Sequence, residues 1–283
     1  MKLYDGLNKL WMNEMNSDDP QLTPIPSLEE ARKALDEIDD RILALLAKRV
    51  DITGQVKRVK QSEVQVYASP LRPTREAAIM RRLLNRSRET DVSPELILRV
   101  WRAIISDSSL RQASITLHVS KHLNANTAHR LRLRDYFGAI NVEEYRDEAQ
   151  ALMQIDSAPG DICVVETEQP WVEAFLAGHG GKAQVIASLP ILKEDEVPKL
   201  LLIGQAPVDA SGDDETLVIS EGKLPRDFTP QPIWQSKIGN LRLSCLPGFL
   251  TEHEGPLVGL MRSNASLKLK IAGRYSSAIQ VDA

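Results

Sequence analysis

The chain has 283 residues, of which 42% are hydrophobic and 26% are charged, a length typical of about two domains. It contains no apolar run of roughly 18 residues, which excludes a membrane-spanning helix, and its two cysteines are too few for a disulfide framework or a cysteine-rich zinc site. The net charge of −4 gives no overall nucleic-acid footprint. Because the acidic start of the chain lacks the apolar core of a secretory signal, we expect a cytoplasmic protein.

Residues 1–26 are polar and end in a proline-containing stretch, which predicts a flexible tail. Ser27 and Glu30 form a capping box at the start of a helix. Apolar residues then recur in steps of three and four to about residue 61, at positions 28, 31, 35, 38, 42, 45, 52, 56 and 59. Such a helix would be about 50 Å long, too long for a small compact monomer, so we expect it to pack against a second copy.

Two further helices complete the predicted helical domain of residues 27–113. The second begins at Arg72-Pro73-Thr74, and the third has Ser93 as its N-cap and continues to about Gln112. This segment carries 17 basic against 13 acidic residues, whereas the remainder carries 18 against 26. The excess of cations favours anion binding, although ordinary variation between two domains explains it equally well.

From Ile115 short apolar runs alternate with helical patterns, which predicts an α/β region with a parallel sheet. The expected fold class is therefore a helical domain followed by α/β structure. We place an α/β lobe at residues 114–208 and a further region at 215–283. The expected strands are 115–117, 140–142, 161–165, 183–188, 199–204, 215–220, 241–246 and 267–272, with helices at 125–137 and 146–154.

Arg49 lies within the apolar stripe of the long helix, where an unpaired cation would be costly. Lys60 lies three turns further along, about 16 Å away, so the two side chains could bracket an anion. Both could equally reach solvent or pair with acids as a structural network.

Other polar residues favour the ligand-binding interpretation. Ser108 and Gln112 share a face of the third helix at i and i+4, and Arg75 and Glu76 lie in the first turn of the second. Arg32 is about 25 Å from Arg49 along the long helix, so one small ligand could contact both only across an antiparallel dimer.

These residues carry a family resemblance over about 85 residues, from Leu28 to Gln112. This segment resembles the all-helical class of chorismate mutase. Its polar residues follow the order of that family's site residues: Arg32, Arg49, Lys60, Arg75, Glu76, Ser108 and Gln112. The matching stretches are Ile38–Arg49, Val56–Lys60, Arg72–Glu76 and Ile104–Ser108.

The resemblance implies an intertwined homodimer that rearranges chorismate to prephenate without metal or cofactor. It implies that Arg49 and the partner's copy of Arg32 hold the substrate carboxylates, and that Lys60 and Gln112 donate to the ether oxygen. Glu76 would bind the ring hydroxyl, and the backbone of Arg75 and Ser108 would support the ring hydroxyl and a carboxylate. Arg72 stands where some members have an aspartate, and it receives no role. Cations and amide donors suit a reaction that needs orientation and stabilisation of a developing oxyanion.

The remainder of the chain resembles prephenate dehydratase over residues 115–204 and an ACT-type regulatory domain over 215–283. The first likeness rests on Asp161–Glu168 and the second on Leu269–Tyr275. The dehydratase Thr-Arg-Phe motif falls on Pro198-Lys199-Leu200, and the chain has room for about one of the two dehydratase lobes. We therefore interpret this half as degenerate and expect no dehydratase activity.

Two alternative functions stay open at the level of sequence. One is a helical dimeric sensor that binds an anionic aromatic metabolite without turnover, and the other is a bifunctional mutase–dehydratase. A metal site at His118 and His122, spaced i and i+4, is discounted because no third ligand is evident, and both are interpreted as exposed polar residues.

Overall fold

The computed structural model describes residues 27–62 and 69–281, and the predicted tail of residues 1–26 lies outside this range. The described residues divide into two units, with the boundary between Val59 and Lys60. None of the described helices is long and apolar enough to span a membrane.

Helix α2 (Leu28–Ser62) confirms the predicted long helix and its start. The backbone N–H of Glu30 donates to Ser27 Oγ at 3.2 Å, and the Ser27 hydroxyl donates to the Glu30 carboxylate at 2.8 Å. The apolar stripe of this helix is exposed, with fractions between 48% and 69% at Leu28, Leu35, Ile38, Ile42, Leu45 and Ile52.

Helices α3 (Pro73–Ser87) and α4 (Pro94–Leu110) pack against each other within the second unit. Ser93 caps α4 by accepting from the backbone N–H of Leu96, as predicted. Helix α4 ends two residues before the predicted Gln112, whose backbone N–H donates to the carbonyl of Ser109, three residues back, at 2.9 Å. Gln112 therefore lies in the turn that follows the helix.

The described strands form one nine-stranded sheet in the order β2-β1-β3-β5-β4-β9-β6-β8-β7. The parallel prediction is correct for β1 with β2 and β3 and for β4 with β9, but the other pairs are antiparallel. Strand β7 was not predicted, and β9 begins three residues later than expected. The strands are β1 (Thr116–Ser120), β2 (Asn141–Tyr145), β3 (Ile162–Glu166), β4 (Gln184–Leu189), β5 (Leu200–Gly204), β6 (Asp214–Ser220), β7 (Trp234–Ile238), β8 (Leu241–Pro247) and β9 (Lys270–Ser276).

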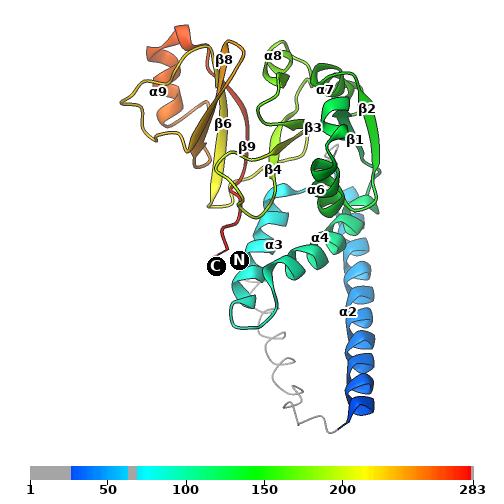
Figure 1. Cartoon of the computed structure of the whole chain (residues 1–283). Coiled ribbons are helices and arrows are strands. Elements are labelled where there is room, and N and C mark those ends of the chain that lie inside the picture. The colour runs from blue at the N-terminus through cyan, green and yellow to red at the C-terminus, as the bar shows by residue number, and fades with distance from the viewer. Residues whose placement is uncertain (1–26, 63–68, 282–283) are drawn as a thin grey trace. The chain divides into compact units, whose positions relative to one another are not determined.

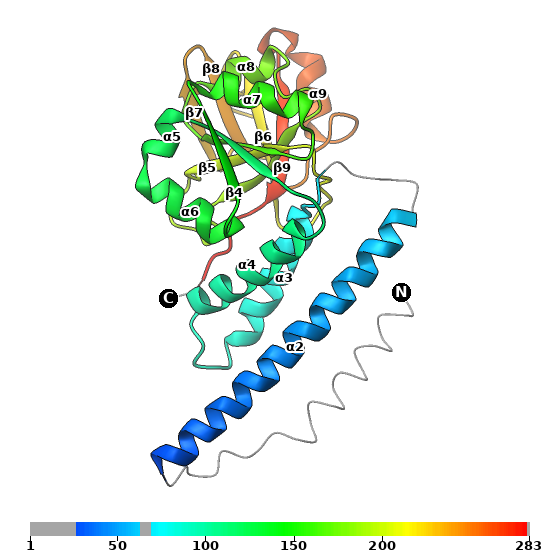
Figure 2. The same cartoon turned by 90° about the vertical axis from the view of Figure 1, so that its right-hand side faces the viewer.

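Helices cover both faces of this sheet, as Figures 1 and 2 show. Helices α7 (Glu148–Ser157) and α8 (Trp171–Leu176) bury one face, around the fully buried Trp171 and Leu152. The opposite face is covered by α5 (Lys121–Ala125) and α6 (Thr127–Phe137) over β1, β3, β4 and β5, and by α9 (Pro256–Ser263) over β6 and β8.

The two predicted α/β regions, 114–208 and 215–283, are joined in this single sheet by the pairing of β4 with β9. Val185 lies opposite Gly273, and a Cβ atom at position 273 would collide with the backbone of Val185. The C-terminal segment adds a second connection, because the backbone N–H of Ile279 donates to the carbonyl of Ile191 at 2.7 Å. Because of the close approach to Val185, position 273 requires a glycine.

Candidate functional site

The predicted site residues are distributed over both units. Arg32 is exposed on α2, and Arg49 is half-buried on the same helix, where its carbonyl accepts the Thr53 hydroxyl at 2.9 Å. The side chain of Lys60 lies outside the described residues. The local settings of Arg75, Glu76, Ser108 and Gln112 are defined within the second unit.

Glu76 is buried, with 6% of its surface exposed, and its carboxylate is the centre of a polar network. One oxygen, Oε2, accepts from Arg102 Nη1 at 2.7 Å, and Oε1 accepts from the backbone N–H of Arg72 at 3.3 Å. The hydroxyl of Tyr136 also donates to Oε2, at the longer distance of 3.4 Å. The pair with Arg102 matters most, because a buried charge is strongly destabilising without a partner.

Arg102 is itself 3% exposed and is fixed by the end of α6. Its Nε and Nη2 donate to the carbonyl of Tyr136 at 3.1 and 2.7 Å, and its guanidinium carbon lies 3.6 Å from the centre of the Tyr136 ring. Burial alone would lower the pKa of the Arg102 guanidinium, but Tyr136 and Glu76 raise it above its ordinary value. Burial raises the pKa of the Tyr136 phenol, which therefore stays a neutral donor.

Sequence analysis did not identify Arg102 or Tyr136. The sequence could have indicated Arg102 by its spacing, because it lies three residues before Ile105 and therefore on the inward face of α4. Its partner could not be identified from the same pattern, because Tyr136 belongs to a different part of the fold.

The remaining predicted residues of α3 and α4 have simpler surroundings. Ser108 is 9% exposed, and its hydroxyl donates to the Ile104 carbonyl at 2.8 Å. The side-chain amide of Gln112 donates to the Ser108 carbonyl at 3.0 Å, so these two residues do lie together, as predicted. Arg75 is exposed at the start of α3. Arg72 donates to the carbonyls of Ser69 and Leu71 at 2.9 and 2.6 Å, which anchors the entry to this helix.

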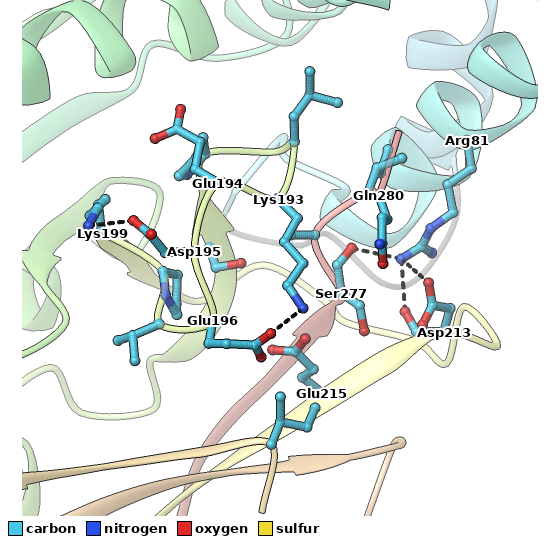
Figure 3. Close-up of a pocket in the computed structure, with 18 of the residues that line it drawn as sticks. Arg81, Lys193, Glu194, Asp195, Glu196, Lys199, Asp213, Glu215, Ser277 and Gln280 are labelled. Atoms are coloured by element: carbon cyan, nitrogen blue, oxygen red, sulfur yellow. Dashed lines mark hydrogen bonds and ion pairs between the residues drawn. The ribbon is translucent and has the colours of Figure 1, made fainter. Parts of the chain in front are cut away.

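A separate cleft of about 400 Å³ lies between α3, the loop that follows β4, and the C-terminal segment. Figure 3 shows Arg81 reaching from α3 toward Asp213 and Ser277, with its Nη2 3.1 Å from the Asp213 carboxylate and 2.9 Å from the Ser277 carbonyl. The loop contributes two ion pairs, Lys193–Glu196 at 2.9 Å and Lys199–Asp195 at 2.6 Å. The volume of the cleft and the mixed charges along its walls suit a small polar molecule.

The segment to which the resemblance assigned the dehydratase motif borders this cleft. Pro198 and Lys199 line it, whereas Leu200 is fully buried at the start of β5. These three positions supply no hydroxyl group.

The histidine prediction needs correction. His118 lies in β1 and is 4% exposed, with Nε2 at 3.0 Å from the Asp161 carboxylate and Nδ1 at 3.1 Å from the Tyr145 hydroxyl. It therefore is not an exposed residue one helical turn from His122, which lies on α5 close to Glu166. Position 118 lies in a strand, so the spacing of i and i+4 does not place the two histidines on one helix face. Among the residues the structure describes, no cluster of three or more histidine, cysteine or acidic side chains can hold a metal ion.

A comparison with known families gives a match within the helical segment. Residues 31–113 match the family model described as chorismate mutase type II. A search of curated proteins gave no match to the chain.

Solved structures resemble the chain weakly. One is described as GqqA, a novel type of quorum quenching acylase, with 9% identity over 58% of this chain and 95% of that chain and a TM-score of 0.39. The prephenate dehydratase of Streptococcus mutans has 14% identity over 58% and 98% of the two chains, with a TM-score of 0.33. The prephenate dehydratase of Arthrobacter aurescens in complex with L-Phe has 16% identity over 60% and 59%, with a TM-score of 0.22. These likenesses are too weak to assign a function.

Proposed function

We propose that the chain is a chorismate mutase that rearranges chorismate to prephenate in aromatic amino acid biosynthesis. The observation that carries the proposal is the match of residues 31–113 to the chorismate mutase type II model, since this segment contains every residue of the predicted site. The helical fold of α2, α3 and α4 supports it.

The chemistry of these residues suits the reaction. Chorismate is a dicarboxylate that must be held in a compact conformation while negative charge grows on the breaking ether oxygen. Arg49 and Arg32 hold the two carboxylates, and Lys60 and Gln112 donate to the ether oxygen. Orientation and preorganised donors of this kind lower the barrier without a nucleophile. Glu76 binds the ring hydroxyl, and the backbone of Arg75 and Ser108 support this hydroxyl and a carboxylate.

The functional form that we propose is a homodimer through α2. The exposed stripe repeats every three and four residues, which is the spacing of a helix that packs along another helix. Arg49 occupies a stripe position between Leu45 and Ile52, so a second copy would cover it. In an antiparallel arrangement, Arg32 of one copy completes the site of the other.

The decisive experiment adds chorismate to the purified full-length chain, follows its absorbance and identifies the product. We expect prephenate. Arg49→Ala and Lys60→Ala should each raise the activation barrier measured by kcat/KM by about 3–5 kcal/mol, with the fold intact. Lys48→Ala is the matched control, because Lys48 is an exposed cation next to Arg49 that has no role in the site. Near-normal turnover by a folded Arg49→Ala protein would contradict the proposal.

The other products distinguish the alternatives. Binding of chorismate without turnover would identify the dimeric sensor. We propose that the α/β region has no dehydratase activity, so added prephenate should stay unchanged. Formation of phenylpyruvate would instead establish a bifunctional enzyme.

A further inference from the structure

We propose that Arg102 is the positioning residue for Glu76, and that the C-terminal turn of α6 holds Arg102 in place. The α/β region would then complete the mutase site instead of merely following it along the chain. This inference rests on the proposed function, because it assigns a role to a partner of Glu76.

The carboxylate of Glu76 can accept more hydrogen bonds than the structure gives it. An ionised carboxylate is an acceptor only, with about four lone-pair positions. Arg102 at 2.7 Å and the backbone N–H of Arg72 at 3.3 Å occupy one position on each oxygen, and Tyr136 at 3.4 Å makes a weaker third contact. Acceptor capacity is left for a substrate hydroxyl, while the two main contacts fix the plane of the carboxylate.

The C-terminal end of α6 fixes the side chain of Arg102. The last carbonyls of a helix have no partner within the helix, and the C-terminus carries a partial negative charge. Helix α6 ends at Phe137, and Arg102 places two of its donors on the Tyr136 carbonyl. The Ser106 hydroxyl, one turn along α4, donates to the Phe137 carbonyl. A cation and a hydroxyl from α4 therefore satisfy the end of α6.

The side chain of Arg102 is held rigidly between α6 and Glu76. The Arg102 guanidinium lies over the Tyr136 ring and is 3% exposed, so it has little freedom to move. Its third nitrogen, Nη1, donates to the Glu76 carboxylate. An arginine suits this role because its planar fork has donors in several fixed directions, whereas a lysine ammonium cannot contact the carbonyl and the carboxylate in the same geometry.

A double-mutant cycle on the full-length chain tests the proposal. Its members are Arg102→Lys, Glu76→Gln and the double variant, with kcat and KM for chorismate measured separately. We expect each single variant to lose about 10- to 100-fold in kcat/KM, and the double variant to lose no more than Glu76→Gln alone. Arg99→Lys is the matched control on α4, because Arg99 is exposed, and it should retain full activity.

This non-additivity separates positioning from a general structural defect, since a defect would add to the loss caused by Glu76→Gln. As a second readout, a chorismate analogue without the ring hydroxyl should be converted equally by the parent and by Arg102→Lys. Losses that multiply in the double variant, or an Arg102→Lys protein with normal kcat/KM, would overturn the proposal.

Two further outcomes are distinguishable. If Arg102→Lys does not fold, Arg102→Gln/Glu76→Gln replaces the buried ion pair by two amides and is compared with Glu76→Gln. Equal kcat/KM supports the proposal, and a lower value for the pair contradicts it. If the parent protein does not convert chorismate, the proposed function fails before the cycle begins.

Discussion

Helix α2 and the unit of residues 60–283 differ in the kinds of residue that they expose and bury. On α2, leucine and isoleucine side chains such as Leu35 and Leu45 are 60% exposed. In the larger unit a charged pair, Glu76 and Arg102, is 6% and 3% exposed. The contrast teaches that the larger unit is stabilised by its own core, whereas the apolar stripe of α2 gains stability only when another surface covers it.

The largest effect that we expect tests the internal stability of the sheet. Gly273→Ala places a Cβ against the backbone of Val185, so β9 and β4 must separate. The free energy of unfolding, measured in urea, should fall by more than about 4 kcal/mol. Gly259→Ala is the control, because a Cβ there meets no atom within 4 Å, and it should be neutral or slightly stabilising.

A matched pair of leucines sharpens the comparison directly. Leu217 is fully buried in β6, and Leu217→Ala should cost about 3 kcal/mol at any protein concentration. Leu45→Ala on α2 should instead change the midpoint of thermal unfolding in a way that depends on protein concentration, because it weakens the proposed interface between copies. A concentration-independent loss for Leu45→Ala would show that the α2 stripe is covered by its own chain.

A charge on the α2 stripe tests the dimer itself. Ile38 is 49% exposed, and Ile38→Glu should raise the dissociation constant of the dimer about 30-fold, which is roughly 2 kcal/mol. Analytical ultracentrifugation measures the shift. Lys33→Glu, outside the stripe, should leave the dimer unchanged. A parent protein that sediments as a monomer would contradict the proposed assembly.

The smallest effect is a dependence of stability on pH within the larger unit. Burial lowers the pKa of His129 below its ordinary value of 6.5, although Glu166, whose carboxylate lies 3.0 Å away, opposes the shift. The unfolded chain therefore binds this proton more readily than the folded chain. The stabilisation is complete above about pH 6.5 and is lost as the pH falls below it.

His129→Gln should flatten the pH dependence of the unfolding midpoint below pH ~6.5. His253→Gln is the control because His253 is exposed. An unchanged slope in His129→Gln would contradict the assignment of this proton to His129.

Much of the helical architecture could be predicted because its determinants are local. The capping box of Ser27 and Glu30, the N-cap Ser93 and the three- and four-residue spacing of α2 each depend on neighbours within one or two turns. Strand β7 was missed although its buried residues alternate with exposed ones, because three of its five residues, Gln235, Ser236 and Lys237, are polar. His118 was misplaced because one strand and one short helix follow each other directly.

The sequence by itself determined where α2, α3 and α4 form and that Ser108 and Gln112 lie together, and it predicted the residues of the candidate mutase site. Only the tertiary structure decided that Arg102 pairs with Glu76, that the end of α6 holds Arg102, and that β4 meets β9 at Gly273. The physical reason is the range of the interactions. Helix caps and stripes are set by residues a few positions apart, whereas a buried ion pair or a strand pairing depends on which distant segments the folded core brings into contact.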